Sequence, residues 1–262
     1  MNKLRRDQDA RSRYDREWFD EIYSQYNRRQ FIHPDPLEFV VRFDDPADQE
    51  IAGLIAATLA FGRVGHILSS LETVFRILEN PAGDIVVMSH RELKEAFNAF
   101  RHRWTTGDEL ANLLLGVKCL REQFGSLECC YASGIGDGDE NVIPSLTAFV
   151  AAVKKASGGR DTSLLSCPTR GSACKRLLLY LRWMVRRDDV DPGPWTGVSP
   201  SMLVVPLDTH MHRISRAMGM TARRQADMKC ALEVTTFFRT LCPEDPVRYD
   251  FALTRPGIRG EL

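Results

Sequence analysis

Lys175 and Asp208 are the two residues whose types and surroundings best suit catalysis. Lys175 opens a strongly apolar helical run at 177–185, so its amine is expected to lie against a low-dielectric wall. A lysine amine that has lost its proton is a nucleophile. Asp208 follows the extended segment VVPL and precedes a run that ends at Gly219, so the pattern predicts the N-cap of a helix. Such a cap would hold the carboxylate still.

Both residues also have simpler interpretations. Lys175 fits equally well as one cation of a solvated or phosphate-binding face, and Asp208 fits as a plain helix cap. His210 and His212 lie close to Asp208 and imitate a metal site. Residues two apart on a helix point in different directions, so we expect no metal there.

The region around Lys175 is strongly basic, although the whole chain has a formal net charge of zero. Residues 154–187 contain nine Lys and Arg against the single acid Asp161, a net charge of plus eight (nine minus one). A block of this kind is typical of a surface for phosphate backbones, although charge runs are more often a solvated face. The candidate nucleic-acid contacts are Arg170, Arg176, Arg182, His210 and Arg213. Charge alone thus leaves a nucleic acid open as the partner and does not distinguish DNA from RNA.

Composition indicates an ordinary cytoplasmic protein. Of the 262 residues, 44% are apolar and 27% are charged, and neither a membrane-spanning run nor a secretory signal is evident. The seven cysteines have no metal-binding spacing, and no glycine-rich phosphate loop is found. We therefore expect no cofactor, no iron–sulfur cluster and no membrane partner.

Hydrophobic periodicity predicts an all-α fold. The segment 202–207 reads as an extended connector, because Pro206 disfavours a central strand. One helix is expected after Asp208 and another in the run that Lys175 opens. Two helices are expected at 51–59 and 64–78, with a break near Gly62. The other expected helices lie at 14–26, 92–100, 108–124, 143–153, 226–241 and 246–253.

The string PLDTHMHRISRAMGM resembles a segment of the helix-hairpin-helix DNA glycosylases of the endonuclease III type, in which an extended chain ends in V-D-T-H and a helix. Three longer strings, GSACKRLLLYLRWMVRRDDVDPGPW, DQEIAGLIAATLAFGRV and DPVRYDFAL, resemble an uncharacterised bacterial family named only as a domain of unknown function. That family looks like a distant branch of the glycosylase superfamily. The resemblance covers about residues 35–253.

The resemblance implies a two-lobed helical fold, with a barrel lobe at 44–154, a second lobe at 1–43 plus 155–262, and a cleft between them. By position, Lys175 matches the lysine that attacks the sugar of a flipped-out nucleotide, and Asp208 matches the aspartate that assists it. Phe61 and Arg63 lie at a turn that faces the cleft in that fold. Together with Trp183 and Trp195, which alternatively belong to the core, they are the candidates for a base pocket.

The sequence departs from the glycosylase pattern in three places. The turn before Lys175 contains only Gly171 where the glycosylases have a glycine-rich hairpin. The spacing from Lys175 to Asp208 is wider than in endonuclease III and closer to that of the archaeal 8-oxoguanine DNA glycosylase. The four-cysteine cluster of endonuclease III is absent from this sequence.

The resemblance predicts a DNA-repair-like N-glycosylase for base excision, with an associated lyase activity on a damaged or modified base. One alternative is a catalytically inactive nucleic-acid-binding module of the same fold. Another is a helical scaffold that binds a protein partner. The sequence defines neither the substrate base nor the oligomeric state.

Overall fold

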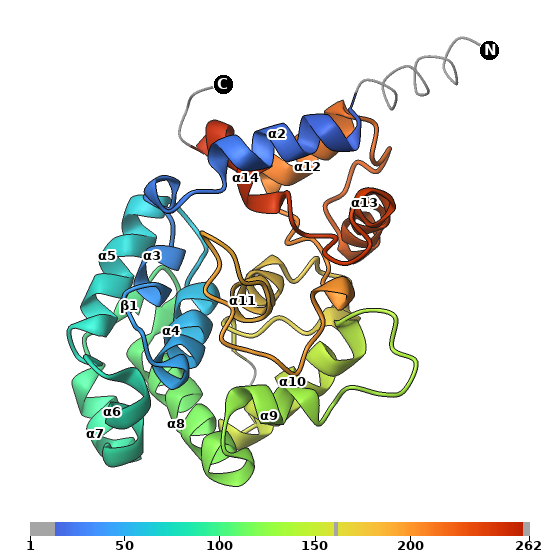
Figure 1. The fold of residues 1–262 in the computed structure, drawn as a ribbon. Coiled ribbons are helices and arrows are strands. Elements are labelled where there is room, and N and C mark those ends of the chain that lie inside the picture. Colours follow the sequence, from blue (N-terminus) through green and yellow to red (C-terminus); the bar gives the residue numbers. More distant parts are fainter. Residues whose placement is uncertain (1–13, 160–161, 259–262) are drawn as a thin grey trace.

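Helices make up almost all the regular structure in the computed structural model, which describes residues 14–159 and 162–258 (Figure 1). The predicted all-α class is confirmed. The only sheet in the described ranges is a two-stranded antiparallel hairpin of β1 (Arg101–His102) and β2 (Thr105–Thr106). None of the described helices is both long enough and apolar enough to span a bilayer.

The first half of the chain contains the longest uninterrupted apolar helix pattern. Asp45 caps α4 by accepting the amide of Ala47, and Pro46 occupies the first helical position, where its missing N–H costs nothing. Gly62, with a φ of 102°, lies in the break between α4 and α5. The helices of this half are α2 (Arg16–Tyr26), α3 (Leu37–Val40), α4 (Pro46–Thr58), α5 (Val64–Phe75), α6 (Pro81–Val87), α7 (His90–Ala96), α8 (Gly107–Phe124) and α9 (Leu127–Ala132), with the 3-10 turn η1 (Arg29–Phe31).

The second half contains the helices that position Lys175 and Asp208. They are α10 (Ile143–Ala156), α11 (Lys175–Val185), α12 (Thr209–Ala217), α13 (Met228–Leu241) and α14 (Asp250–Ile258), with the 3-10 turns η2 (Pro168–Arg170) and η3 (Pro200–Met202). Lys175 is the first residue of α11, and Asp208 is the N-cap of α12, as predicted. The extended connector before Asp208 is also confirmed, because 203–207 forms neither helix nor strand.

Three short helices, α3, α6 and α9, were not predicted from the sequence. Each spans fewer than two full turns, so its apolar residues repeat too few times to show a helical period. The N-terminus of α9 is stabilised from a distance, because the buried carboxylate of Glu50 on α4 accepts the amides of Leu127 and Glu128. That contact depends on tertiary structure.

The helix that begins at Lys175 lies centrally in the molecule (Figure 1). It packs along α4, where Gly53 permits close approach: a Cβ at this position would lie 2.7 Å from the Met184 side chain. In Figure 1, α2, α12, α13 and α14 lie together on one side and α3 to α10 on the other. The boundary of the two lobes at residue 154 stays a prediction.

Candidate functional site

Lys175 presents a half-buried side chain at the start of α11. Within the part of the chain that the structure describes, its amine has neither a hydrogen bond nor an ion pair. The first turn of α11 contains no acidic residue, and the N-cap Cys174 provides no side-chain cap. No carboxylate of the described residues therefore pairs with the amine, so a nucleophilic role is compatible with its described surroundings.

Asp208 is held by local structure. Its Oδ1 accepts the amide of Met211 at 2.8 Å, which is the standard N-cap contact. The side chain is half-buried, and its charge contributes to raising the pKa of Asp250. Asp250 begins α14, which packs against α12. The carboxylate of Asp208 is therefore fixed, as expected, and lies near the start of α14.

Arg182 connects Asp250 to the helix that carries Lys175. It lies seven residues after Lys175, two turns further along nearly the same face of α11. Its Nη1 donates to Asp250 Oδ2 at 2.6 Å, and Nη2 donates to Asp191 Oδ1 at 3.0 Å. The ion pair of Arg182 with Asp250 thus connects the helix that begins at Lys175 to α14, against which α12 packs.

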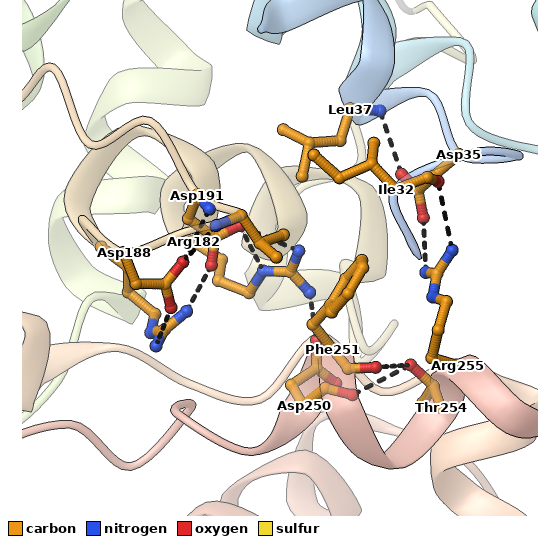
Figure 2. A network of polar contacts seen from close by, with 12 residues as sticks. Ile32, Asp35, Leu37, Arg182, Asp188, Asp191, Asp250, Phe251, Thr254 and Arg255 are labelled. Carbon is orange, nitrogen blue, oxygen red and sulfur yellow. Dashed lines mark hydrogen bonds and ion pairs between the residues drawn. The ribbon is translucent and has the colours of Figure 1, made fainter. Parts of the chain in front are cut away.

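The predicted role of Arg182 in nucleic-acid binding is wrong. Its side chain is only 3% exposed, and its guanidinium is consumed by Asp191 and Asp250 (Figure 2). A buried arginine that is already paired with two carboxylates cannot reach a phosphate. Charge counting missed this point because the compensating acids lie outside the 154–187 block.

The carboxylates around Arg182 outnumber the guanidiniums that they contact. Arg186 also lies in this buried network, paired with Asp188, Asp191 and Asp245. Two arginines therefore face four aspartates, counting Asp250. Burial raises the pKa of Asp250 to about 6, the charge of Arg182 opposes the shift, and the charge of Asp208 adds to it. The pKa of Asp250 therefore lies above the ordinary value of an aspartate.

Trp183 and Trp195 do not form a base pocket. Trp183 is fully buried at 0% exposure, and Trp195 is 3% exposed and donates its Nε1–H to Glu50 at 2.7 Å. Both belong to the core, which is the alternative interpretation that the sequence left open. α11 is apolar around most of its circumference, so position 183 faces other helices instead of a ligand.

An exposed aromatic pair lies elsewhere, between Phe61 and Trp104. Their rings stack with centroids 5.0 Å apart and planes inclined by 24°, and Trp104 is 59% exposed. Arg103 lies over the Trp104 ring at 4.7 Å. Phe61 follows α4 and Trp104 occupies the loop of the β1–β2 hairpin. We call these two rings the aromatic shelf.

The hairpin and the helix end that form the shelf are fixed by His102. Its Nε2 donates to the carbonyl of Phe61 at 3.0 Å, and its Nδ1 accepts the hydroxyl of Ser70 at 2.8 Å. Burial lowers the pKa of His102, which favours this neutral tautomer. The loop residue Arg103 has a φ of 56°, a strained value of the kind that often marks functional sites.

The sequence predicted only one half of the shelf. Phe61 was a candidate for the base pocket, whereas Trp104 was not selected. No periodic pattern predicts that a two-residue hairpin loop packs on a helix end so far away in the chain. The exposed aromatic surface is thus visible only in the tertiary structure.

Arg176 links the shelf to Lys175. Its guanidinium lies 5.0 Å from the centre of the Phe61 ring, and it donates to the carbonyls of Thr58 and Ser163. Both Nη atoms are thus used within the protein, which leaves Nε for a ligand, and the nucleic-acid role of Arg176 stays a prediction. Arg176 directly follows Lys175 in the first turn of α11, so the shelf contacts the same helix turn that carries the amine.

The remaining candidates lie at the surface. Arg63, the N-cap of α5, is exposed next to Phe61 and Gly62. His210 and Arg213 on α12 lie against the end of α14, where a Cβ at Gly257 would be 3.4 Å from His210 Nδ1. The side chain of Arg170 lies outside the described part. A nucleic-acid role for Arg63, His210 and Arg213 stays a prediction.

A cavity of about 450 Å³ adjoins the segment before α11. It is lined by Lys154 of α10 and by several hydroxyl groups between Thr162 and Ser172, and neither Lys175 nor Asp208 lines it. The described residues contain no group of His, Cys, Asp and Glu that is arranged to hold a metal ion.

Comparison with known families places the chain in one of them. The model of a protein family of unknown function, DUF2400, matches residues 35–259. The chain belongs to this family. The match agrees with the predicted resemblance to an uncharacterised family and includes Lys175, Asp208 and both rings of the shelf. No curated protein and no solved structure gives a significant match.

Proposed function

We propose that this DUF2400 protein binds DNA at an unpaired or extruded nucleotide and acts on it as an N-glycosylase with associated lyase activity. The proposal extends the resemblance to the helix-hairpin-helix glycosylases. The observation that carries it is the amine of Lys175, which has no ion pair among the described residues, in the helix turn whose next residue, Arg176, faces the Phe61 ring of the shelf. An aromatic surface stacks on bases of any sequence, and arginines beside it attract the phosphates.

In the proposed reaction the amine nitrogen of Lys175 attacks C1′ of the nucleotide. The new C–N bond forms as the bond from C1′ to the base breaks, and the electron pair leaves with the base. The nitrogen loses one proton and the departing base takes one up. The nitrogen lone pair then forms a C=N bond as the C1′–O4′ bond breaks, and O4′ keeps that electron pair and takes up the second proton of the nitrogen, which leaves an imine and an open sugar. Asp208, held by its cap contact, would stabilise the positive charge that develops on the sugar.

Borohydride trapping tests this reaction, because the reductant converts the imine into a stable protein–DNA adduct. The substrates are duplexes that carry oxidised, deaminated or abasic sites. We expect an adduct with the wild-type protein and none with Lys175→Ala, whereas Lys94→Ala on the exposed side of α7 should behave as wild type. The absence of an adduct with every substrate, or equal trapping by Lys175→Ala, would exclude the reaction.

A second candidate is a binding module of the same fold that has no catalytic activity. It is favoured by the segment before Lys175. Apart from the pair at 158–159, the only glycine between Ser157 and Lys175 is Gly171. Backbone amides that could hold a phosphate are correspondingly few. Salt-dependent DNA binding that is intact in Lys175→Ala and in Asp208→Ala, without any product, would identify this function.

A further inference from the structure

Arg176 contacts three separate segments around the start of α11. Nη1 donates to the Thr58 carbonyl at the end of α4 at 2.6 Å. Nη2 donates to the Ser163 carbonyl at 2.5 Å and to Ser166 Oγ at 3.4 Å. The same guanidinium faces the ring of Phe61. One side chain thus determines how the shelf lies relative to Lys175.

The charge of Arg176 has no counter-ion in the described ranges. The three other largely buried arginines, Arg182, Arg186 and Arg255, each contact at least one carboxylate. Arg176 contacts only carbonyl and hydroxyl oxygens, and its closest charged neighbour in the chain is the cation Lys175. Burial lowers the pKa of Arg176, which reflects this unfavourable setting. Partly buried charges are normally paired, and none of the carboxylates of the described residues pairs with Arg176.

One donor of Arg176 is still available. Nε has no hydrogen bond to the described residues, and it is not among their buried polar atoms that lack a partner. The Nε–H is therefore open to solvent between the shelf and the first turn of α11. A ligand whose base stacks on the shelf would carry its phosphate within about one nucleotide length of that group.

We propose that Arg176 positions the shelf beside Lys175 and supplies the positive charge that a phosphodiester of the bound strand neutralises. The inference rests on the proposed function, since it assumes that the ligand is a DNA strand. It assigns the base to Phe61 and Trp104 and the neighbouring phosphate to Arg176. In this arrangement the sugar between base and phosphate lies next to the amine of Lys175.

The salt dependence of binding tests the assignment, because each neutralised phosphate releases counter-ions. Binding of a fluorescein-labelled single-stranded oligodeoxynucleotide is measured by anisotropy between about 50 and 200 mM salt. For Arg176→Met we expect the slope of log K against log salt to be smaller by about 0.7, the value for one phosphate on a single strand. Arg176→Lys keeps the charge and should keep the slope.

Arg239→Met is the matched control. Arg239 is also half-buried and also donates to a backbone carbonyl, that of Ser201, but it lies on α13. Its replacement should leave the slope at the wild-type value. If Arg176 had only a structural role, Arg176→Met and Arg176→Lys would both change the affinity, and neither would reduce the slope.

An NMR measurement on the wild-type protein keeps the test independent of whether Arg176→Met folds. The Nε–H resonance of Arg176, assigned with Arg176→Lys, should shift when the oligonucleotide is added. An unchanged resonance, or a folded Arg176→Met with the wild-type slope, would overturn the assignment while leaving DNA binding intact. No binding by the wild-type protein would instead refute the proposed function itself.

Discussion

Phe61 and Trp104 stack face to face, although one follows a buried helix and the other lies in the loop of a small hairpin. His102 ties the two together by donating to the backbone of Phe61. The result is a rigid aromatic surface with the guanidinium of Arg103 over its exposed ring. Large exposed aromatic side chains cost solvation free energy, so a fixed one indicates a binding role.

Replacing Trp104 with alanine is expected to weaken binding of single-stranded DNA by about 1–3 kcal/mol, the range measured for one base on an aromatic ring. The free energy of unfolding should change by about 1 kcal/mol or less, because the side chain is largely exposed. Fluorescence anisotropy gives the first quantity and urea denaturation the second. Val87→Ala, at an exposed position on α6, is the control. Equal affinity in Trp104→Ala would remove the shelf from the binding surface.

Two replacements of Asp208 separate its cap from its charge. Asparagine caps helices about as well as aspartate, so Asp208→Asn should keep the thermal midpoint, whereas Asp208→Ala should cost about 1 kcal/mol. If the charge takes part in the reaction, both variants lose borohydride trapping. Trapping by Asp208→Asn at the wild-type rate would show that the residue is only a cap.

The stability of the protein should depend on pH through Asp250. Burial raises the pKa of this carboxyl to about 6, above its value of about 3.9 in an unfolded chain. Between these values the folded protein binds more protons than the unfolded chain, so this group makes stability fall as pH rises from about 4 to about 6. The free energy of unfolding is measured by denaturation at a series of pH values. The contribution of Asp250 is the difference in this free energy between wild type and Asp250→Asn. A difference that stays constant from about pH 4 to about pH 6 would contradict the prediction. Glu95→Gln on the surface of α7 serves as the control.

Arg182→Met should destabilise the protein by about 3–5 kcal/mol, because it leaves Asp191 and Asp250 buried without their partner. Urea denaturation measures the loss. Arg91→Met breaks an exposed pair with Glu95 on α7 and should cost less than about 1 kcal/mol. Similar losses in the two variants would mean that the buried network contributes little to stability.

The sequence by itself determined those features that depend on neighbours in the chain. Asp208 was predicted as an N-cap because the contact spans three residues, and α4, α5, α8 and α13 were predicted because their apolar positions repeat over several turns. Local interactions of this kind do not need the rest of the molecule. The family membership also follows from the sequence alone, because a family model compares residues in their order along the chain.

Only the tertiary structure decided which of the polar and aromatic residues are available to a ligand. Arg182 and Trp183 have the residue types of a nucleic-acid site, yet they are buried because α11 packs against other elements on nearly all sides. Trp104 became a candidate because a hairpin loop brings it onto Phe61. Burial and charge pairing depend on segments that are far apart in the chain, and periodicity contains no information about which segments meet.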